Sequence, residues 1–227
     1  MFNMWKKSIY KMIFIIASTV LFVAGCGGNN NDEANNNNKE ATEQKKEQKN
    51  DENRVSTQDE LDEVGEWYED EDGKMTVLAA GTEDIPFTGN GVDYTIRNTM
   101  IVRIENLSND LKEAIQFATG EESIPDQINV LLTTMDKKNK LEEAVEFTGI
   151  HTAVLGSKQI DVILNDFAYD GNEGSTMQAG VEMTDNIAIL LEETDAEQVR
   201  FVVSSAYRSS DLEDTDDEHE VVIDLKR

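Results

Sequence analysis

Cysteine and histidine are scarce in this chain of 227 residues, which has one cysteine, Cys26, and two histidines, His151 and His219. A lone cysteine excludes a disulfide within the chain, so the folded part must be stabilised by its hydrophobic core. A Ser/His/Asp triad would have to use one of the two histidine rings. The Gly-x-Ser-x-Gly, His-Glu-x-x-His and Cys-x-x-Cys patterns are also missing. We therefore expect a protein that is not an enzyme, and a structural, partly buried role for His151.

Basic residues are few as well, with 20 Lys and Arg against 47 Asp and Glu. Three of the lysines fall within residues 1–25, and without that segment the formal charge is 17 − 47 = −30. Nucleic acid phosphate and anionic lipid headgroups repel so acidic a chain, so we expect no nucleic acid partner. Cations and basic proteins are better candidates, although the charge is expected first of all to keep the protein soluble.

The N-terminus has the pattern of an export signal. Lys6, Lys7 and Lys11 precede an apolar run, Met12–Ala24, which only one Ser-Thr pair interrupts. The run is shorter than the roughly 20 residues of a membrane-spanning helix, so it predicts the apolar region of a signal peptide. It ends with two small residues followed by the only cysteine, in the segment Val23–Cys26.

The segment Val23-Ala24-Gly25-Cys26 resembles the lipobox of bacterial lipoproteins. In that family the cysteine receives a diacylglycerol and a peptidase then cuts before it. The resemblance implies that residues 1–25 are a signal peptide and that Cys26 carries the lipid. It also implies a membrane-anchored protein on the extracytoplasmic face of the cell membrane. Two acyl chains are enough for stable anchoring, whereas one chain binds only reversibly.

Residues 26–60 are rich in Asn, Lys and Glu and have almost no apolar side chain. Such a segment cannot bury enough surface to offset its chain entropy, so we expect a disordered tether with a reach of about 30 Å. An Asn/Lys-rich tether after a lipobox is similar to those of Gram-positive lipoproteins.

Residues 61–227 are long enough for one domain and predict an all-β fold, an antiparallel β-sandwich. Apolar residues alternate or form short β-branched runs between turn residues, which favours strands over helices. We expect strands in these segments: 75–79, 95–105, 128–132, 145–147, 160–164, 187–191, 199–203 and 221–225. Turns are expected at 69–73, 89–91, 136–140 and 156–157. Short helical turns are expected only at 107–118, 141–144 and 194–198.

The stretch Met100–Asn109 resembles a strand of the immunoglobulin-like domains of unknown function found in Gram-positive lipoproteins. The segments Met177–Gly180, Ile187–Leu191 and Ala196–Phe201 are similar to the closing strands of that family. The resemblance implies an immunoglobulin-like sandwich at the cell surface. That family offers no catalytic residues to carry over, and the chain departs from it in its long insertion, Gly149–Asp170.

Acidic clusters predict the main alternative, which is a calcium site. Asp166, Asp170 and Glu173 could place several oxygens around a hard cation, although Ala168 stands where an EF-hand loop needs an oxygen ligand. Asp211–Glu220 is the densest acidic run, and such a run is usually a solvated loop.

Two other motifs have a structural and a functional interpretation. Gly89-Asn90-Gly91 hints at a phosphate-binding loop but lacks its later residues, so a turn is expected. Trp67-Tyr68 could stack on a sugar or peptide, but such a pair more often closes a sandwich core. The sequence therefore predicts a non-catalytic module that binds a surface protein or wall component, with calcium binding as the alternative.

Overall fold

The computed structural model describes residues 53–168 and 175–227. The predicted signal peptide, Cys26 and most of the predicted tether lie outside the described residues, as do Asp170 and Glu173. Val55–Arg227 forms one compact unit, so the unit begins a little ahead of residue 61.

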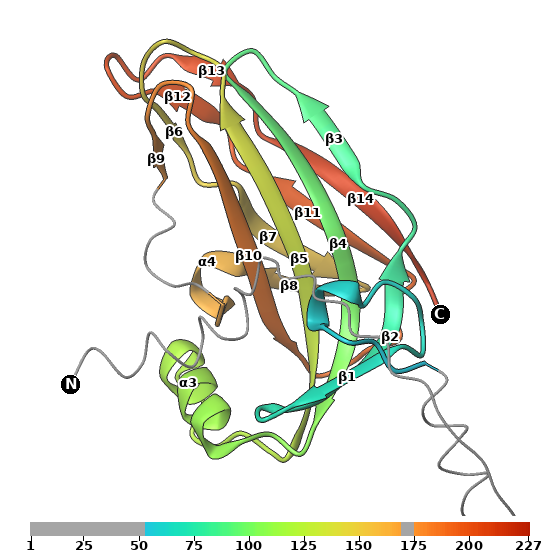
Figure 1. Ribbon diagram of the computed structural model, residues 1–227. Coiled ribbons are helices and arrows are strands. Elements are labelled where there is room, and N and C mark those ends of the chain that lie inside the picture. The colour runs from blue at the N-terminus through green and yellow to red at the C-terminus, as the bar shows by residue number, and fades with distance from the viewer. Residues whose placement is uncertain (1–52, 169–174) are drawn as a thin grey trace, which may run out of the picture. The chain divides into compact units, whose positions relative to one another are not determined.

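Strands make up most of this unit, and its described helices are short (Figure 1). In chain order the elements are η1 (Gln58–Glu60), β1 (Trp67–Asp70), β2 (Gly73–Gly81), β3 (Ile85–Thr88), β4 (Val92–Glu105), α3 (Asn109–Thr119), β5 (Gln127–Asn139), β6 (Val145–Phe147), β7 (Ile150–Leu155), β8 (Lys158–Asp161), α4 (Val162–Asn165), β9 (Thr176–Met177), β10 (Glu182–Leu191), β11 (Gln198–Val203), β12 (Ala206–Arg208), β13 (Asp214–Asp216) and β14 (His219–Lys226).

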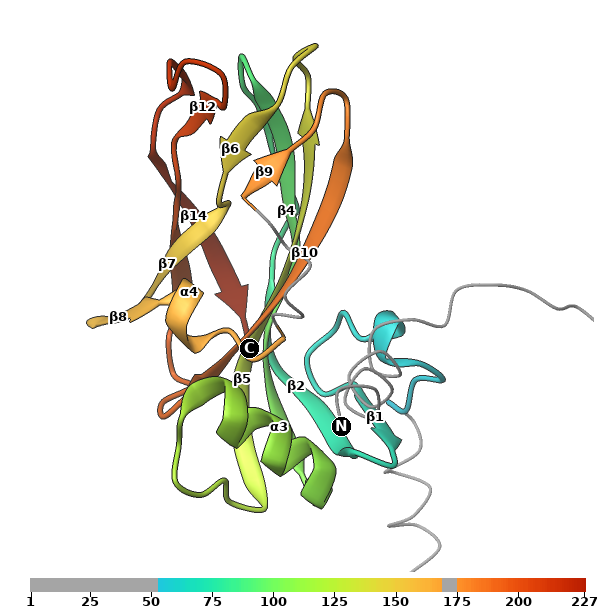
Figure 2. The ribbon, with the colours of Figure 1, turned by 90° about the vertical axis from the view of Figure 1, so that its left-hand side faces the viewer.

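All strand pairs among the described residues are antiparallel, and the sandwich arises because one large sheet folds over on itself. Its strand order is β10-β5-β4-β2-β14-β11-β7-β8, with β1 added to β2 and β3 added to β4. β2 and β14 share only a short ladder, Leu225 opposite Gly81 and Lys226 opposite Ala80. At this seam the sheet turns, so that β4, β5 and β10 face β7, β11 and β14 (Figure 2). The all-β sandwich predicted from the alternating apolar residues is confirmed.

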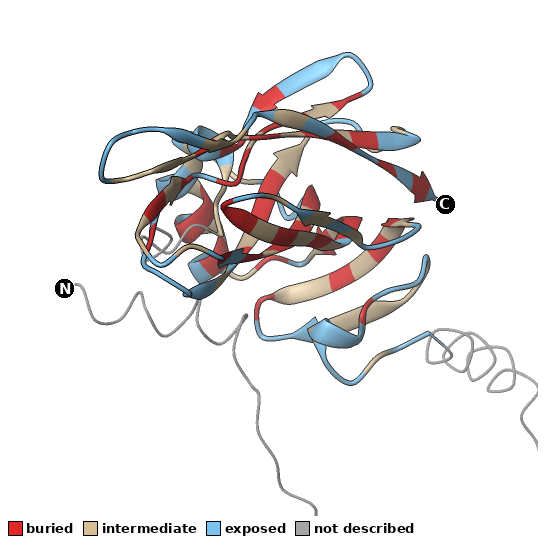
Figure 3. Cartoon of the chain, turned by 90° about the horizontal axis from the view of Figure 1, so that it is seen from above, coloured by how far each residue is buried: buried red, intermediate tan, exposed pale blue. Residues whose placement is uncertain are grey.

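The core lies between these two layers. Ile101 and Leu131 from one layer and Phe201 and Ile223 from the other belong to the same buried cluster. Seen from above, the strands show buried and more exposed segments in alternation, as the period of two in a strand requires (Figure 3).

A bulge in β4 changes which face its side chains occupy. Asn98 has a φ of 52°, and the β4–β5 register shifts between Arg97 and Met100. Met100, Val102 and Ile104 alternate along the expected strand and share one face, and all three are buried outside the main core cluster. Ile101 lies in the main cluster, so this part of β4 is buried on both faces.

A second, smaller sheet has the order β13-β12-β6-β9. β6 directly precedes β7 and β12 directly follows β11 in the chain, so this sheet extends the β7–β11 layer toward one end of the sandwich (Figure 2). We call that end, where the β3–β4 turn and β13 lie, the tip.

Two sequence predictions that relied on charged residues and on alternation were wrong. The turn expected at 136–140 is absent, because β5 continues to Asn139 with Asp136 paired to Arg97 and Lys137 to Asp185. The strand expected at 160–164 ends at Asp161. The side chain of Asp161 accepts a hydrogen bond from the Leu164 N–H and so starts the helix α4.

The helical turns expected at 141–144 and 194–198 do not form either. Asn139 replaces helical hydrogen bonds at the first segment, because its side chain accepts from the Leu141 N–H and donates to the Glu143 carbonyl. At the second, the Glu197 carbonyl accepts from the Leu225 N–H of β14. Only the prediction at 107–118 was right, since α3 forms there with Ser108 as its N-cap.

Candidate functional site

The only described residue of the predicted calcium site is Asp166, and its carboxylate already serves the fold. Asp166 Oδ1 accepts hydrogen bonds from the backbone N–H groups of Ala168, at 2.9 Å, and Ala188, at 2.8 Å. The bond from Ala188 attaches the end of α4 to β10, and the bond from Ala168 stabilises the turn that follows α4. Burial raises the pKa of Asp166 to about 7 against the lowering effect of the two hydrogen bonds, and the nearby Asp185 raises it further.

Across residues 53–168 and 175–227, no group of three or more His, Cys, Asp or Glu side chains is arranged to bind a metal ion. Calcium binding through Asp166, Asp170 and Glu173 stays a prediction, because the last two lie outside the described residues.

A buried ion pair lies near Asp166, within the sheet. Lys137 of β5 and Asp185 of β10 are directed at each other, with Nζ and Oδ2 2.5 Å apart and side chains 2% and 9% exposed. Burial raises the pKa of Asp185, although the ammonium of Lys137 lowers it. The other oxygen of Asp185 has no hydrogen-bond partner among the described atoms. A pair so enclosed fixes the β5–β10 register, because neither charge is stable there without the other.

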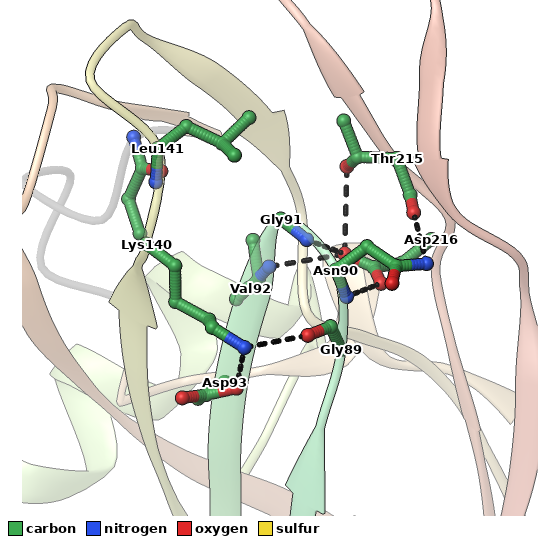
Figure 4. Close-up of polar contacts among 10 residues, drawn as sticks. Gly89, Asn90, Gly91, Val92, Asp93, Lys140, Leu141, Thr215 and Asp216 are labelled. Atoms are coloured by element: carbon green, nitrogen blue, oxygen red, sulfur yellow. Dashed lines mark hydrogen bonds and ion pairs between the residues drawn. The ribbon is translucent and has the colours of Figure 1, made fainter.

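At the tip, the turn predicted at Gly89-Asn90-Gly91 is present, and it does bind an anionic group (Figure 4). That group is the carboxylate of Asp216. Its Oδ1 accepts the Asn90 N–H at 2.5 Å, and its Oδ2 accepts the N–H groups of Gly91, at 2.9 Å, and Val92, at 3.0 Å. Three successive backbone donors converge on one side chain, which is the arrangement that turns use to bind anions.

Both glycines of this turn are required by the close approach of β13. A Cβ at Gly89 would stand 2.4 Å from Asp216 Oδ1, and one at Gly91 would stand 2.4 Å from Thr215 Oγ1. Lys140 completes the tip, since its ammonium donates to the Gly89 carbonyl at 2.7 Å and pairs with Asp93 at 3.1 Å (Figure 4). The site therefore joins the β3–β4 turn, β13 and the residue that follows β5 through contacts within the chain.

Next to this turn, three rings form a stack. The ring centroids of Phe87 and Tyr94 are 4.8 Å apart, and those of Phe87 and His219 are 4.3 Å apart. The Tyr94 hydroxyl is hydrogen-bonded to His219 Nε2. Burial, with a smaller contribution from the charge of Asp216, raises the pKa of Tyr94 above its usual range. Tyr94 therefore stays protonated and can donate to the imidazole.

His151 is half-buried and hydrogen-bonded on both sides. Nε2 lies 3.1 Å from a Glu218 oxygen, and Nδ1 lies 3.0 Å from the Thr152 hydroxyl. A hydroxyl, an imidazole and a carboxylate are thus connected, but Thr152 is only 8% exposed and follows His151 in the same strand. The contacts match the structural role expected for His151.

Trp67 and Tyr68 lie in β1, which pairs with β2 at the margin of the large sheet. The ammonium of Lys74 lies over the Trp67 ring, 4.1 Å from its centroid. The aromatic pair is half-buried there and does not belong to the main core cluster that it was expected to close.

Two of these sites could not be recognised from the sequence. Asp216 is one of seven acids in Asp211–Glu220, and nothing in the run distinguishes it from its neighbours. Lys137 stands among charged residues that are typical of a solvated turn. Only the glycine spacing of residues 89–91 pointed to the tip.

The sequence matches no protein-family model and no curated protein sequence. Among solved structures, the chain is similar to a functionally unknown protein from Listeria monocytogenes EGD-e, with 11% identity and a TM-score of 0.48 over 67% of this chain and 87% of that one. It is also similar to the yjhA protein from Bacillus subtilis, with 13% identity and a TM-score of 0.37 over 60% of this chain and 94% of that one. Likeness at this level identifies no ligand or activity. In the described part of the chain, no helix is both long enough and apolar enough to span a membrane.

Proposed function

We propose that this chain is a lipid-anchored protein of the extracytoplasmic face of a bacterial cell membrane, and that its β-sandwich is a non-catalytic binding module. One observation supports the anchor above all others. The only cysteine follows a basic segment, an apolar run of signal-peptide length and two small residues, in Val23–Cys26. A diacylglycerol on Cys26 would provide the two acyl chains that stable anchoring needs.

The charge of the sandwich limits what it would bind. Val55–Arg227 has 12 Lys and Arg against 40 Asp and Glu, a formal charge of 12 − 40 = −28. Such a surface repels nucleic acid and anionic lipid and favours basic partners. The two polar clusters described above, at Asp216 and at Lys137–Asp185, are occupied by contacts within the chain. These features support binding through the surface of the domain rather than chemistry in a site.

The anchor is tested by comparing the wild type with Cys26→Ser and with the neighbouring control Gly27→Ser, expressed in a bacterium that processes lipoproteins. The wild type and the control should incorporate a labelled fatty acid, partition into the detergent phase and be degraded when intact cells are treated with protease. Cys26→Ser should lose the label and partition into the aqueous phase. Equal labelling of the wild type and Cys26→Ser would contradict the proposal.

A further inference from the structure

Among the large apolar side chains that are exposed in the described part of the chain, three belong to α3 and α4. Phe117 is 77% exposed, Ile163 62% and Leu164 72%. The two helices contact each other, and both views show them next to each other on the same side of the sandwich (Figures 1 and 2). We call these three exposed residues on the two contacting helices the helical patch. Large exposed apolar residues on neighbouring elements are a common mark of an interaction site.

The helices below the patch are fixed in place, so its exposure does not result from fraying. α3 buries Leu111, Ala114 and Ile115 and is capped by Ser108. α4 follows directly from β8, and only one of its apolar residues, Val162, is buried.

Asp161 caps the start of α4, and Asp166 attaches its end to β10. Because both ends are attached to the sheet, the short helix presents Ile163 and Leu164 to solvent in a defined position.

The margin of the patch is negatively charged. The segments 106–126 and 158–168, which contain the two helices and their flanks, have seven Asp and Glu against two Lys, and six of these acids remain when the buried Asp166 is left aside. Both lysines are already ion-paired, Lys112 with Asp126 and Lys158 with Glu192. Exposed acids without such a neutralising pair in these segments include Glu113, Glu121 and Glu122.

The exposed apolar residues and the negatively charged margin together favour one kind of binding partner over the others. Two copies of the patch would bring two negative margins together, and an anionic membrane would be repelled for the same reason. A positively charged segment gains from the margin and buries its apolar residues on the centre. We infer that the helical patch docks a basic protein segment that carries apolar anchor side chains. The inference rests on the proposed binding function and adds the surface and the chemistry of the partner.

The test uses the full chain in a neutral detergent and a labelled amphipathic Lys/Leu peptide, with a Glu/Leu peptide of the same length and leucine positions as its counterpart. Fluorescence anisotropy should show binding of the Lys/Leu peptide only, weakening as sodium chloride is raised. Ile163→Ser/Leu164→Ser should raise Kd by about tenfold or more. The control Leu212→Ser/Val222→Ser removes exposed apolar residues elsewhere, 69% and 49% exposed, and should leave Kd unchanged.

A second set of variants tests the charged margin without touching α4. Glu113→Gln/Glu121→Gln/Glu122→Gln should weaken binding more than Glu83→Gln/Glu142→Gln/Asp217→Asn, which removes the same number of exposed charges from segments that do not adjoin α3 or α4. Equal effects of the two charge sets, or of the two apolar sets, would overturn the inference.

Two further results would assign the patch to another occupant and also overturn the inference. One is self-association in sedimentation experiments that Ile163→Ser/Leu164→Ser abolishes. The other is binding to phosphatidylglycerol vesicles that the same variant abolishes. The peptide assay does not depend on acylation, so an unmodified Cys26 would contradict the anchor and leave this result standing.

Discussion

Asp216 Oδ2 accepts the backbone N–H of Gly91 at 2.9 Å, which joins β13 to a turn 125 residues earlier in the chain. Asn90 and Val92 donate to the same carboxylate. The hairpin β3–β4 and strand β13 are therefore attached to each other at the tip, next to the stacked ring of His219.

Removing this carboxylate should loosen the tip. We expect Asp216→Ala to lower the free energy of unfolding by about 1–3 kcal/mol, because three backbone donors lose a charged acceptor. Gly89→Ala should act in the same direction, since its Cβ would collide with Asp216. Urea unfolding of the full chain measures both, with the exposed neighbour Asp217→Ala as control. Equal stability of the Asp216 and Asp217 variants would show that the contact is dispensable.

In the buried ion pair of Lys137 and Asp185, we expect the effect of removing one charge on protein stability to depend strongly on whether the other is present. Lys137→Met leaves Asp185 buried without its cation, and breaking such a pair costs about 3–5 kcal/mol. The double variant Lys137→Met/Asp185→Leu replaces both charges by apolar groups and should recover most of that loss. A double-mutant cycle in urea measures the coupling. Additive losses from the two single variants would rule out the coupling.

Asp166 predicts a specific dependence of stability on pH. Its pKa is about 7 in the folded protein against an ordinary value of 3.8, so the folded state keeps a proton that the unfolded chain has lost between these values. Its contribution to stability is complete below about pH 4 and decreases as the pH rises through 7. Burial raises the pKa of Asp185 as well, which adds a decrease in the same direction.

Asp166→Asn cannot ionise and keeps an oxygen that can accept from Ala168 and Ala188. Its melting temperature relative to the wild type should therefore rise between pH 5 and pH 8. Asp195→Asn, an exposed control, should show no such trend. A constant difference between Asp166→Asn and the wild type over that range would mean that Asp166 titrates normally.

The strands that could be predicted from the sequence are those in which apolar residues recur with a period of two. Val199–Val203 and Val221–Leu225 were expected as buried strands and form β11 and β14, because a strand between two layers must be apolar on its inner face. Glycine spacing at residues 89–91 predicted a turn for local reasons that also need no partner.

The sequence could not predict features that depend on a distant partner. In the sequence, Lys137 and Asp136 have the charge that is typical of turn residues. They lie in a strand because each forms an ion pair with a distant residue, Lys137 with Asp185 and Asp136 with Arg97. Likewise, Val162 and Leu164 alternate like strand residues, and only the capping bond from Asp161 makes the segment helical. The site at the tip depends on Asp216. Its neighbours in the sequence are also acidic, and only the folded chain places its carboxylate against the turn at residues 89–91.

The effect of calcium on the melting temperature distinguishes the proposed binding module from the alternative, in which the acidic loops bind a cation. A charge of −28 on Val55–Arg227 predicts that sodium chloride raises the melting temperature by screening self-repulsion, and that the rise then levels off. At matched ionic strength, sub-millimolar calcium should add little. A specific site would add about 2.7 kcal/mol at 100 times its Kd, which is several degrees. Saturable stabilisation by calcium and not magnesium, lost in Asp166→Asn/Asp170→Asn, would support the cation site instead.

The central claim concerns the state of Cys26, and mass spectrometry of the mature N-terminus tests it most directly. Protein extracted from the membrane and digested with a protease should yield an N-terminal peptide that begins at Cys26 and carries the mass of a diacylglycerol. A mature chain that begins at another residue, or a Cys26 without acyl chains, would contradict the account.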